Sequence, residues 1–299
     1  NEIQKWGLTD YVGAVTDGTY GAVGLDFKSP HTGLAAKKVW FFFDKTYVCL
    51  GTDISSRMKN QVLTTVNQCL LNGQVTVSDA DGIHPQERGS RMKKGVRWVV
   101  HDRVGYYFLN KENVILSNQR TEGSWKIANR QTTTPTDIIQ QDVFTLSVDH
   151  GSYPNNEGYA YMVVPSADPL SIEKQVEEEG VVVLANCPDV QAVRHDGLNM
   201  AYAVFYKGGT LRIHDKIVVE MDAPGMLMVK YNDAGEILTL GVSDPTRFMK
   251  KLHLSVNQRI VGTAQENIQT EWDGKQALTR ITVELPQNEY AGKSVIYNK

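Results

Sequence analysis

Four consecutive aromatic residues, Trp40–Phe43, limit what this chain can fold into. The pair Asp44-Lys45 separates them from a second apolar run, Tyr47–Leu50. Aromatic and β-branched residues favour strands, so two such runs around a short charged break predict a β-hairpin. Because successive residues of a strand point to opposite faces, we expect both faces of this strand to be covered. The alternative is an aromatic platform for sugar rings, which would require exposed side chains.

Short alternating or apolar runs recur along the chain, separated by glycine, asparagine, aspartate and proline. Many short strands at this spacing predict an all-β protein built from antiparallel sandwiches. The strongest runs are Arg97–Val100, Val104–Phe108, Val143–Asp149, Tyr159–Val164, Ala201–Tyr206, Gly225–Tyr231, Ile237–Leu240 and Leu278–Leu285.

One segment, Pro169–Glu179, has a helical pattern, with Ile172 and Val176 four residues apart and Ser171 suited to cap it. A new series of strands begins at Val181. We therefore predict a large sandwich domain over residues 1–180 and a smaller β domain over residues 181–299.

Composition and charge exclude several classes of protein. A chain of 299 residues with 41% hydrophobic content is long enough for two cored domains. Its net charge of −3 provides no basic field for nucleic acid, and no apolar run is long enough to span a membrane. The three cysteines lack metal-site spacing, so we expect free buried thiols and assign neither a metal site nor a cofactor.

Two histidines lie beside carboxylates and could serve as general bases. Asp149-His150-Gly151 ends a predicted strand, and His101-Asp102 lies between two predicted strands. Neighbours on a strand point to opposite faces, and both sequences suit turns, so we favour structural roles for them. Motifs of serine hydrolases, zinc proteases and nucleotide-binding loops do not occur in the sequence.

Three segments are candidates for binding a sugar polymer. Thr64–Gln68 includes Asn67 and Gln68, whose amides would bind sugar hydroxyls or carboxylates or, on an internal strand, neighbouring backbone. The basic stretch Arg88–Arg97, with Arg91 inside it, would attract an anionic polysaccharide, although a solvated loop leading into a strand is the favoured interpretation. Trp125 would either stack on a sugar ring from a loop or close the edge of the sandwich.

Taken together and in this order, several segments resemble polysaccharide lyase family 8, which includes chondroitin AC, hyaluronate and xanthan lyases. The form of the aromatic run is most similar to the chondroitin AC lyases. The segments are Lys37–Leu50, Thr64–Gln68, His101–Phe108, Glu122–Asn129, Asp149–Gly151, Tyr159–Pro165, Val183–Asn186 and Gln191–Tyr206.

The resemblance implies an α/α toroid, a large central sandwich of the galactose-mutarotase-like kind, and a small C-terminal β-sandwich. It also implies β-elimination at a uronic acid, with the catalytic Asn, His, Tyr and Arg on the toroid. No segment of this chain matches the toroid, so we assign no catalytic residue here. We also expect the first strands of the central sandwich to precede Asn1, and their edges to be covered by an upstream segment or a neighbouring molecule.

By this resemblance the chain is the non-catalytic β part of a secreted or periplasmic bacterial lyase acting on chondroitin or hyaluronan. Its partners would be the acidic polysaccharide and the upstream toroid, and calcium is compatible with the family although no acidic loop suggests a site. The alternatives are a stand-alone carbohydrate-binding module and an enzyme of the mutarotase type. Only fold analogy supports the mutarotase alternative.

Overall fold

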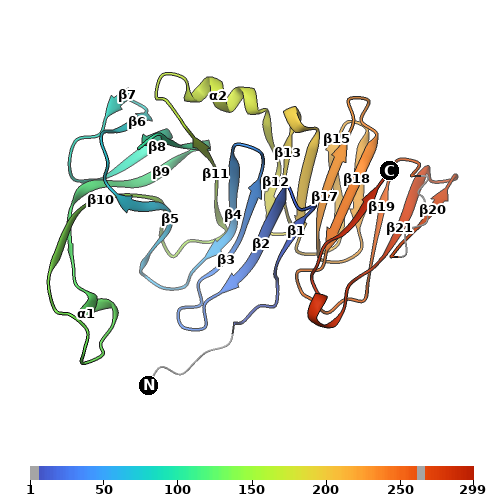
Figure 1. Cartoon of the computed structure of the whole chain (residues 1–299), viewed down its shortest axis with the longest axis horizontal. Helices are drawn as coiled ribbons and strands as arrows, with labels where there is room; N and C mark the ends of the chain where they lie inside the picture. The colour runs from blue at the N-terminus through green and yellow to red at the C-terminus, as the bar shows by residue number, and fades with distance from the viewer. Residues whose placement is uncertain (1–6, 261–266) are drawn as a thin grey trace. The chain divides into compact units, whose positions relative to one another are not determined.

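The computed structural model describes residues 7–260 and 267–299, which form two compact units (Figure 1). The first unit contains residues 7–58, 154–160 and 173–299 apart from the gap, and the second contains residues 59–153 and 161–172. Strand β11 (Glu157–Pro165) and helix α2 (Ile172–Glu179) contribute residues to both units. None of the described helices is long and apolar enough to cross a membrane. The predicted domain boundary at residue 180 stays a prediction.

The first unit begins with four antiparallel strands in sequential order. Each strand pairs with the next through a short connection, as expected for hairpins of alternating residues. The strands are β1 (Val12–Thr16), β2 (Gly21–Lys28), β3 (Ala35–Phe42) and β4 (Tyr47–Ser55).

Strands β3 and β4 are the hairpin predicted from the aromatic run, but only one of them is covered on both faces. On β3 the side chains alternate, so that Val39 and Phe41 are buried while Phe42 is 41% exposed and Trp40 is half-buried. On β4 five successive residues, Val48–Thr52, are all buried. The expectation of two covered faces, made for the aromatic strand, is therefore wrong for β3, whereas β4 is the strand buried on both faces. The difference arises because β3 presents one face to the core of the unit.

A six-stranded sheet follows in the same unit, in the order β12-β13-β14-β17-β18-β22. Its central strands β14 and β17 are buried at almost every position, which explains why their sequences are continuously apolar rather than alternating. The strands are β12 (Val181–Cys187), β13 (Val190–His195), β14 (Met200–Phe205), β17 (Gly225–Tyr231), β18 (Ile237–Ser243) and β22 (Val295–Asn298).

One face of this sheet packs on a five-stranded sheet of order β15-β16-β19-β21-β20, forming a sandwich with one shared apolar core. The other face contacts the first hairpins, where Phe41 lies against the Tyr202 ring and Tyr11 donates a hydrogen bond to the Phe205 carbonyl. The five strands are β15 (Gly209–His214), β16 (Ile217–Met221), β19 (Lys251–Val256), β20 (Ile268–Asp273) and β21 (Leu278–Glu284).

The second unit is built around the 20-residue strand β9, which pairs with different neighbours along its length. Its first part lies between β8 and β11, and its second part pairs with β10, which in turn pairs with β5. The other elements are β5 (Gln61–Leu70), β6 (Val75–Asp79), β7 (Gly82–Pro85), β8 (Ser90–His101), β9 (Val104–Gly123), α1 (Trp125–Ala128) and β10 (Ile139–Ser152).

Several local predictions can be compared with this structure. Six of the eight predicted strands lie within observed strands, and the other two, Ala201–Tyr206 and Leu278–Leu285, extend one residue beyond β14 and β21. The predicted helix is α2. At the start of α2 the Asp168 carboxylate, rather than Ser171, accepts a backbone hydrogen bond, from Leu170 N–H. The three cysteines are free thiols as expected; Cys49 is buried, whereas Cys69 and Cys187 are half-buried.

Candidate substrate-binding residues

The two predicted amide residues lie on β5, which pairs with β10. Asn67 is half-buried, and its side-chain N–H donates to the hydroxyl of Tyr106, which is itself buried. Gln68 is the next residue on the strand and is exposed. Adjacent strand residues point to opposite faces, so only Gln68 is available to a ligand in the described structure. For Asn67 the structure thus gives the internal interpretation, a hydrogen bond to a neighbouring side chain.

The Asn67–Tyr106 pair belongs to a buried cluster centred on His101. The His101 ring stacks on the Phe144 ring with centroids 4.3 Å apart, and the Tyr106 ring stacks on the Phe144 ring with centroids 6.0 Å apart. His101 Nε2 accepts a hydrogen bond of 3.0 Å from the Asn72 N–H. The residue is only 1% exposed, so it holds the core together and cannot reach a substrate in this structure.

The β8–β9 turn beside this cluster explains why His101 is held in place. Asp102 and Arg103 both have positive φ, of 48° and 64°, as in the tight turns whose twist suits a hairpin. The Asp102 carboxylate accepts a hydrogen bond of 2.9 Å from the Asn72 side chain. The structural role predicted for His101-Asp102 is confirmed.

Burial lowers the pKa of His101, although the nearby Asp102 carboxylate opposes this shift. Below about pH 6.5 the unfolded chain binds a proton that the folded chain does not, so acid favours unfolding. We expect the free energy of unfolding to decrease as pH falls through this range, and to decrease less in His101→Gln. Denaturant unfolding of both proteins between about pH 5 and 8 measures this. Parallel pH dependences in the two proteins would contradict it.

The second histidine candidate also has a structural setting. The Asp149 carboxylate accepts hydrogen bonds from Gly151 N–H at 2.9 Å and from the Gln61 side chain at 3.0 Å. The first of these is the Asx-type turn expected here, and Gly151 has a φ of 71°. A hydrogen bond of 2.9 Å joins His150 Nε2 to the Thr64 hydroxyl rather than to Asp149. The side chains therefore do not form the acid–base pair considered from the sequence.

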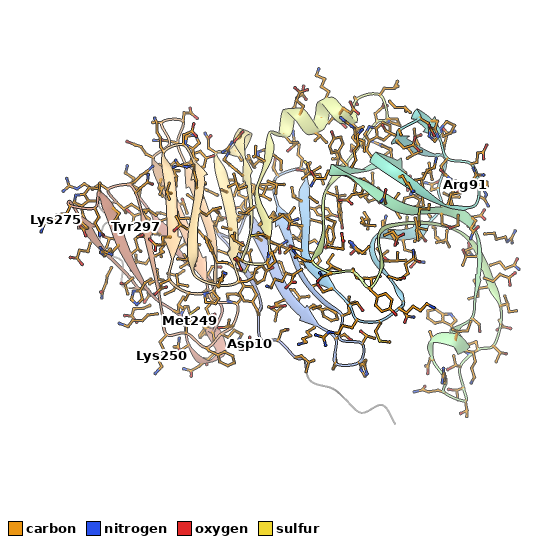
Figure 2. The ribbon with its side chains drawn as sticks, turned by 180° about the vertical axis from the view of Figure 1, so that it is seen from behind. Asp10, Arg91, Met249, Lys250, Lys275 and Tyr297 are labelled. Atoms are coloured by element: carbon orange, nitrogen blue, oxygen red, sulfur yellow. The ribbon has the colours of Figure 1, made fainter. Side chains whose placement is uncertain are left out.

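The basic stretch is part of a strand rather than a loop, because β8 begins at Ser90. Backbone pairing with β9 fixes it, with a bulge at Gly95, whose φ is 62°. Arg91 is exposed and forms an ion pair of 2.6 Å with Glu87 (Figure 2). Lys93 binds Asp79 at 3.1 Å. Part of the positive charge seen in the sequence is thus balanced by neighbouring carboxylates.

Trp125 begins the four-residue helix α1, in the connection between the long strands β9 and β10. The expected loop is thus a single helical turn, capped by the Ser124 hydroxyl, which accepts from Lys126 N–H. The Trp125 side chain is 62% exposed, and Ile127 and Ile138 in the same connection are also exposed. The alternative in which the ring closes a sandwich edge does not fit this exposure.

Within the part of the chain that the structure describes, no hydrogen bond or ion pair joins any two of Asn67, Gln68, Arg91 and Trp125. They lie in the same compact unit but on separate elements, so their assignment to substrate binding stays a prediction. The described residues also contain no group of three or more His, Cys, Asp or Glu that could hold a metal ion.

Sequence reasoning missed a polar hollow of about 510 Å³ in the first unit, on strands β16, β19, β20 and β21. The alternation of polar residues on these strands was visible in the sequence. The pairings of β16 with β19 and of β19 with β21, and their register, were not visible, because they join segments that are distant along the chain.

Comparison with known families identifies the class of protein that this fold represents. Residues 1–176 match the polysaccharide lyase family 8 super-sandwich domain, and residues 182–253 match the C-terminal beta-sandwich domain of the same family. The chain belongs to polysaccharide lyase family 8. This confirms the family indicated by the sequence motifs and the predicted fold class, a large antiparallel sandwich followed by a smaller one.

Particular relatives are lyases of several polysaccharides. The chain is 35% identical over 291 residues to the chondroitinase-AC of Pedobacter heparinus, covering 97% of this chain and 38% of that protein. It is 28% identical over 241 residues to the xanthan lyase of Bacillus sp. (strain GL1), covering 77% of this chain and 25% of that protein. A solved chondroitinase AC lyase superposes with a TM-score of 0.82 at 34% identity, covering 98% of this chain and 40% of that structure. The chain therefore spans about two fifths of the chondroitinases that it matches.

Proposed function

We propose that this chain is the β-sandwich part of a lyase that cleaves chondroitin- or hyaluronan-type glycosaminoglycans by β-elimination. The observation that carries the proposal is the 35% identity to a chondroitinase-AC over 97% of the chain. The buried setting of His101 and the hydrogen bond between His150 and Thr64 support a scaffold role for this chain. The catalytic groups would lie on an α/α toroid in the same protein.

In such a lyase the carboxylate of the uronic acid must be neutralised before the C5 proton is removed, because charge develops next to it in the transition state. The leaving glycosidic oxygen then takes a proton, and an unsaturated uronide remains. The β part would form one wall of the cleft. Its contributions would be the exposed Gln68 amide, the Arg91 guanidinium and the Trp125 ring, together with Asn67 through its bond to Tyr106.

We also propose that the enzyme is secreted or periplasmic. Its polymeric, charged substrate lies outside the cytoplasm, and a lyase must meet it there. Signal-sequence processing and cell fractionation of the full-length protein would test this, and retention in the cytoplasm would contradict it.

The function is tested by incubating the full-length protein, and separately this chain, with chondroitin, hyaluronan and xanthan. We expect the full-length protein to release an unsaturated product that absorbs in the ultraviolet from chondroitin or hyaluronan, and this chain to release none. Turnover by this chain would overturn the scaffold assignment. Absence of turnover by a folded full-length protein on all three polymers would overturn the lyase assignment.

The exposure of Trp125 favours a second candidate, a stand-alone carbohydrate-binding module. Under this candidate the chain by itself binds chondroitin or hyaluronan oligosaccharides in calorimetry and loses that binding in Trp125→Ala. Failure of the wild-type chain to bind would exclude it.

Trp125→Ala also tests the role of this ring in the full-length lyase. Aromatic contacts are worth about 0.5–1.5 kcal/mol, so we expect KM to rise up to about tenfold with kcat unchanged. The matched control is Tyr290→Ala, which removes another exposed aromatic ring, from the first unit. Equal kinetics in wild type and Trp125→Ala would remove this residue from the substrate site.

A further inference from the structure

A row of polar side chains crosses the outer face of the five-stranded sheet. The pairing register places Glu220 of β16 beside Ser255 of β19, Ser255 beside Arg280 of β21, and Arg280 beside Glu271 of β20. On β16 and β19 the residues before and after these point into the apolar core, so Glu220 and Ser255 point outward. Arg280 and Glu271 are themselves exposed. With neighbouring strands about 4.8 Å apart, the row spans about 14 Å.

A second row lies next to it, two residues along each strand. His253 of β19 pairs with Thr282 of β21, which pairs with Gln269 of β20. His253 Nδ1 lies 3.0 Å from the Thr282 hydroxyl. Asp222 ends the row, since its carboxylate accepts a hydrogen bond of 3.2 Å from the His253 N–H.

The sizes of these side chains produce the hollow of about 510 Å³. The middle strands carry the short Ser255 and Thr282, which leave space beside the longer Arg280 and His253 of the same strands. Glu220 stands on one side, and Gln269 and Glu271 stand on the other. The volume lies within the range of small-ligand sites, about 300–1,000 Å³.

The charge of the hollow is predominantly negative. Glu220, Asp222 and Glu271 form no ion pair with another described residue. The cation of the first row, Arg280, is already bound to the Asp273 carboxylate at 3.0 Å. An anionic polymer would meet like charge here, which disfavours its binding. The lining is thus unsuited to the glycosaminoglycan of the proposed function.

The hydrogen-bonding groups of the hollow suit a ligand whose every polar group both donates and accepts. Carboxylates accept, the Gln269 amide does both, and the Ser255 and Thr282 hydroxyls do both. Sugar hydroxyls have this double character, whereas the charged side chains of a basic peptide only donate and would leave the donors of Ser255, Thr282 and Gln269 unused.

We propose that this hollow, the β19–β21 groove, binds an uncharged, hydroxyl-rich oligosaccharide. It is a second carbohydrate site, on the first unit, and it does not depend on the lyase activity. No phenylalanine, tyrosine or tryptophan is among the described residues that line the groove, so recognition is by hydrogen bonds, and we expect a dissociation constant in roughly the millimolar range.

The test is a nuclear magnetic resonance titration of this chain with cellotetraose, chitotetraose, a hyaluronan tetrasaccharide and tetralysine. We expect at least one of the two neutral tetrasaccharides to bind saturably, with little dependence on salt. The double variant Gln269→Ala/Glu271→Ala, on the strand nearest the turn at Lys275 (Figure 2), should weaken that binding at least tenfold. Glu220→Ala, at the other end of the first row, should weaken it as well.

The matched control is Lys251→Ala/Glu284→Ala, which removes the next cross-strand pair on the same face, an ion pair of 2.6 Å outside the groove lining. It should bind the neutral sugar as wild type does. The proposal is overturned if neither neutral tetrasaccharide binds, if only hyaluronan or tetralysine binds, or if both groove variants keep full affinity. Equal unfolding midpoints of the variants and wild type establish that affinity changes do not come from unfolding.

Discussion

Replacing Gly51 by alanine is expected to destabilise the first unit by about 3 kcal/mol or more, because the added methyl group has no space. A Cβ atom at this position would lie 2.1 Å from Cε1 and 2.5 Å from Cζ of Tyr159. The Tyr159 ring is buried and so has little room to move. The expected result is a large decrease in the denaturant concentration at half-unfolding, measured by far-ultraviolet circular dichroism.

The surroundings of Gly51 strengthen this expectation. The Asn186 side chain donates hydrogen bonds of 3.1 Å to both the Gly51 and the Tyr159 carbonyls, so it fixes the two backbones relative to each other. Asn186 is fixed in turn by Gln191, which donates to it at 2.8 Å. Separating the strands to admit a methyl group would break this network.

Gly209→Ala is the matched control for Gly51→Ala. Gly209 is also a strand residue of the first unit, has no heavy atom within 4 Å of an added Cβ, and has an ordinary backbone conformation. It should unfold as wild type does or at slightly higher denaturant concentration. If Gly51→Ala were as stable as Gly209→Ala, this would contradict the inference that the Tyr159 ring leaves no space for a methyl group at residue 51.

Trp98→Ala is expected to lower the free energy of unfolding of the second unit by about 3–5 kcal/mol, the range for removing a large aromatic side chain from a core. Trp98 is fully buried, and it lies on β8 between partners Ser78 of β6 and Tyr107 of β9. Its removal leaves a cavity between strands that cannot close without breaking their pairing. Denaturant unfolding measures the decrease in the free energy of unfolding. It is followed by far-ultraviolet circular dichroism, because that signal reports the strands and not the tryptophan that is removed.

Trp125→Ala is the control for Trp98→Ala because it removes the same side chain from an exposed site of the same unit. It should change the free energy of unfolding by no more than about 0.5 kcal/mol relative to wild type. Equal losses in the two variants would show that the burial of Trp98 is not what stabilises the unit. The pair separates the packing role of one tryptophan from the binding role proposed for the other.

The strands were predictable because their signals are local. Alternation, β-branched residues and the turn at His101-Asp102 act over a few residues, and each predicted strand matches an observed one to within one residue at its end or lies inside it. The ordered motifs around the aromatic hairpin also indicated the family, which the domain matches confirm. The prediction that both faces of the aromatic strand are covered was wrong, as the exposure of Phe42 shows.

The amino-acid sequence by itself determined that this chain is all-β, where its strands lie and which lyase family it belongs to. The tertiary structure alone decided that Phe42 is exposed while Phe41 is buried, that Asn67 binds Tyr106, and that polar residues of four strands form the β19–β21 groove. These features depend on the pairing and register of strands far apart in the chain, such as β16 with β19. Alternation within one strand shows which residues share a face, but it does not show which distant strand lies beside it, and a one-residue change of register would move every side chain of a strand to the other face.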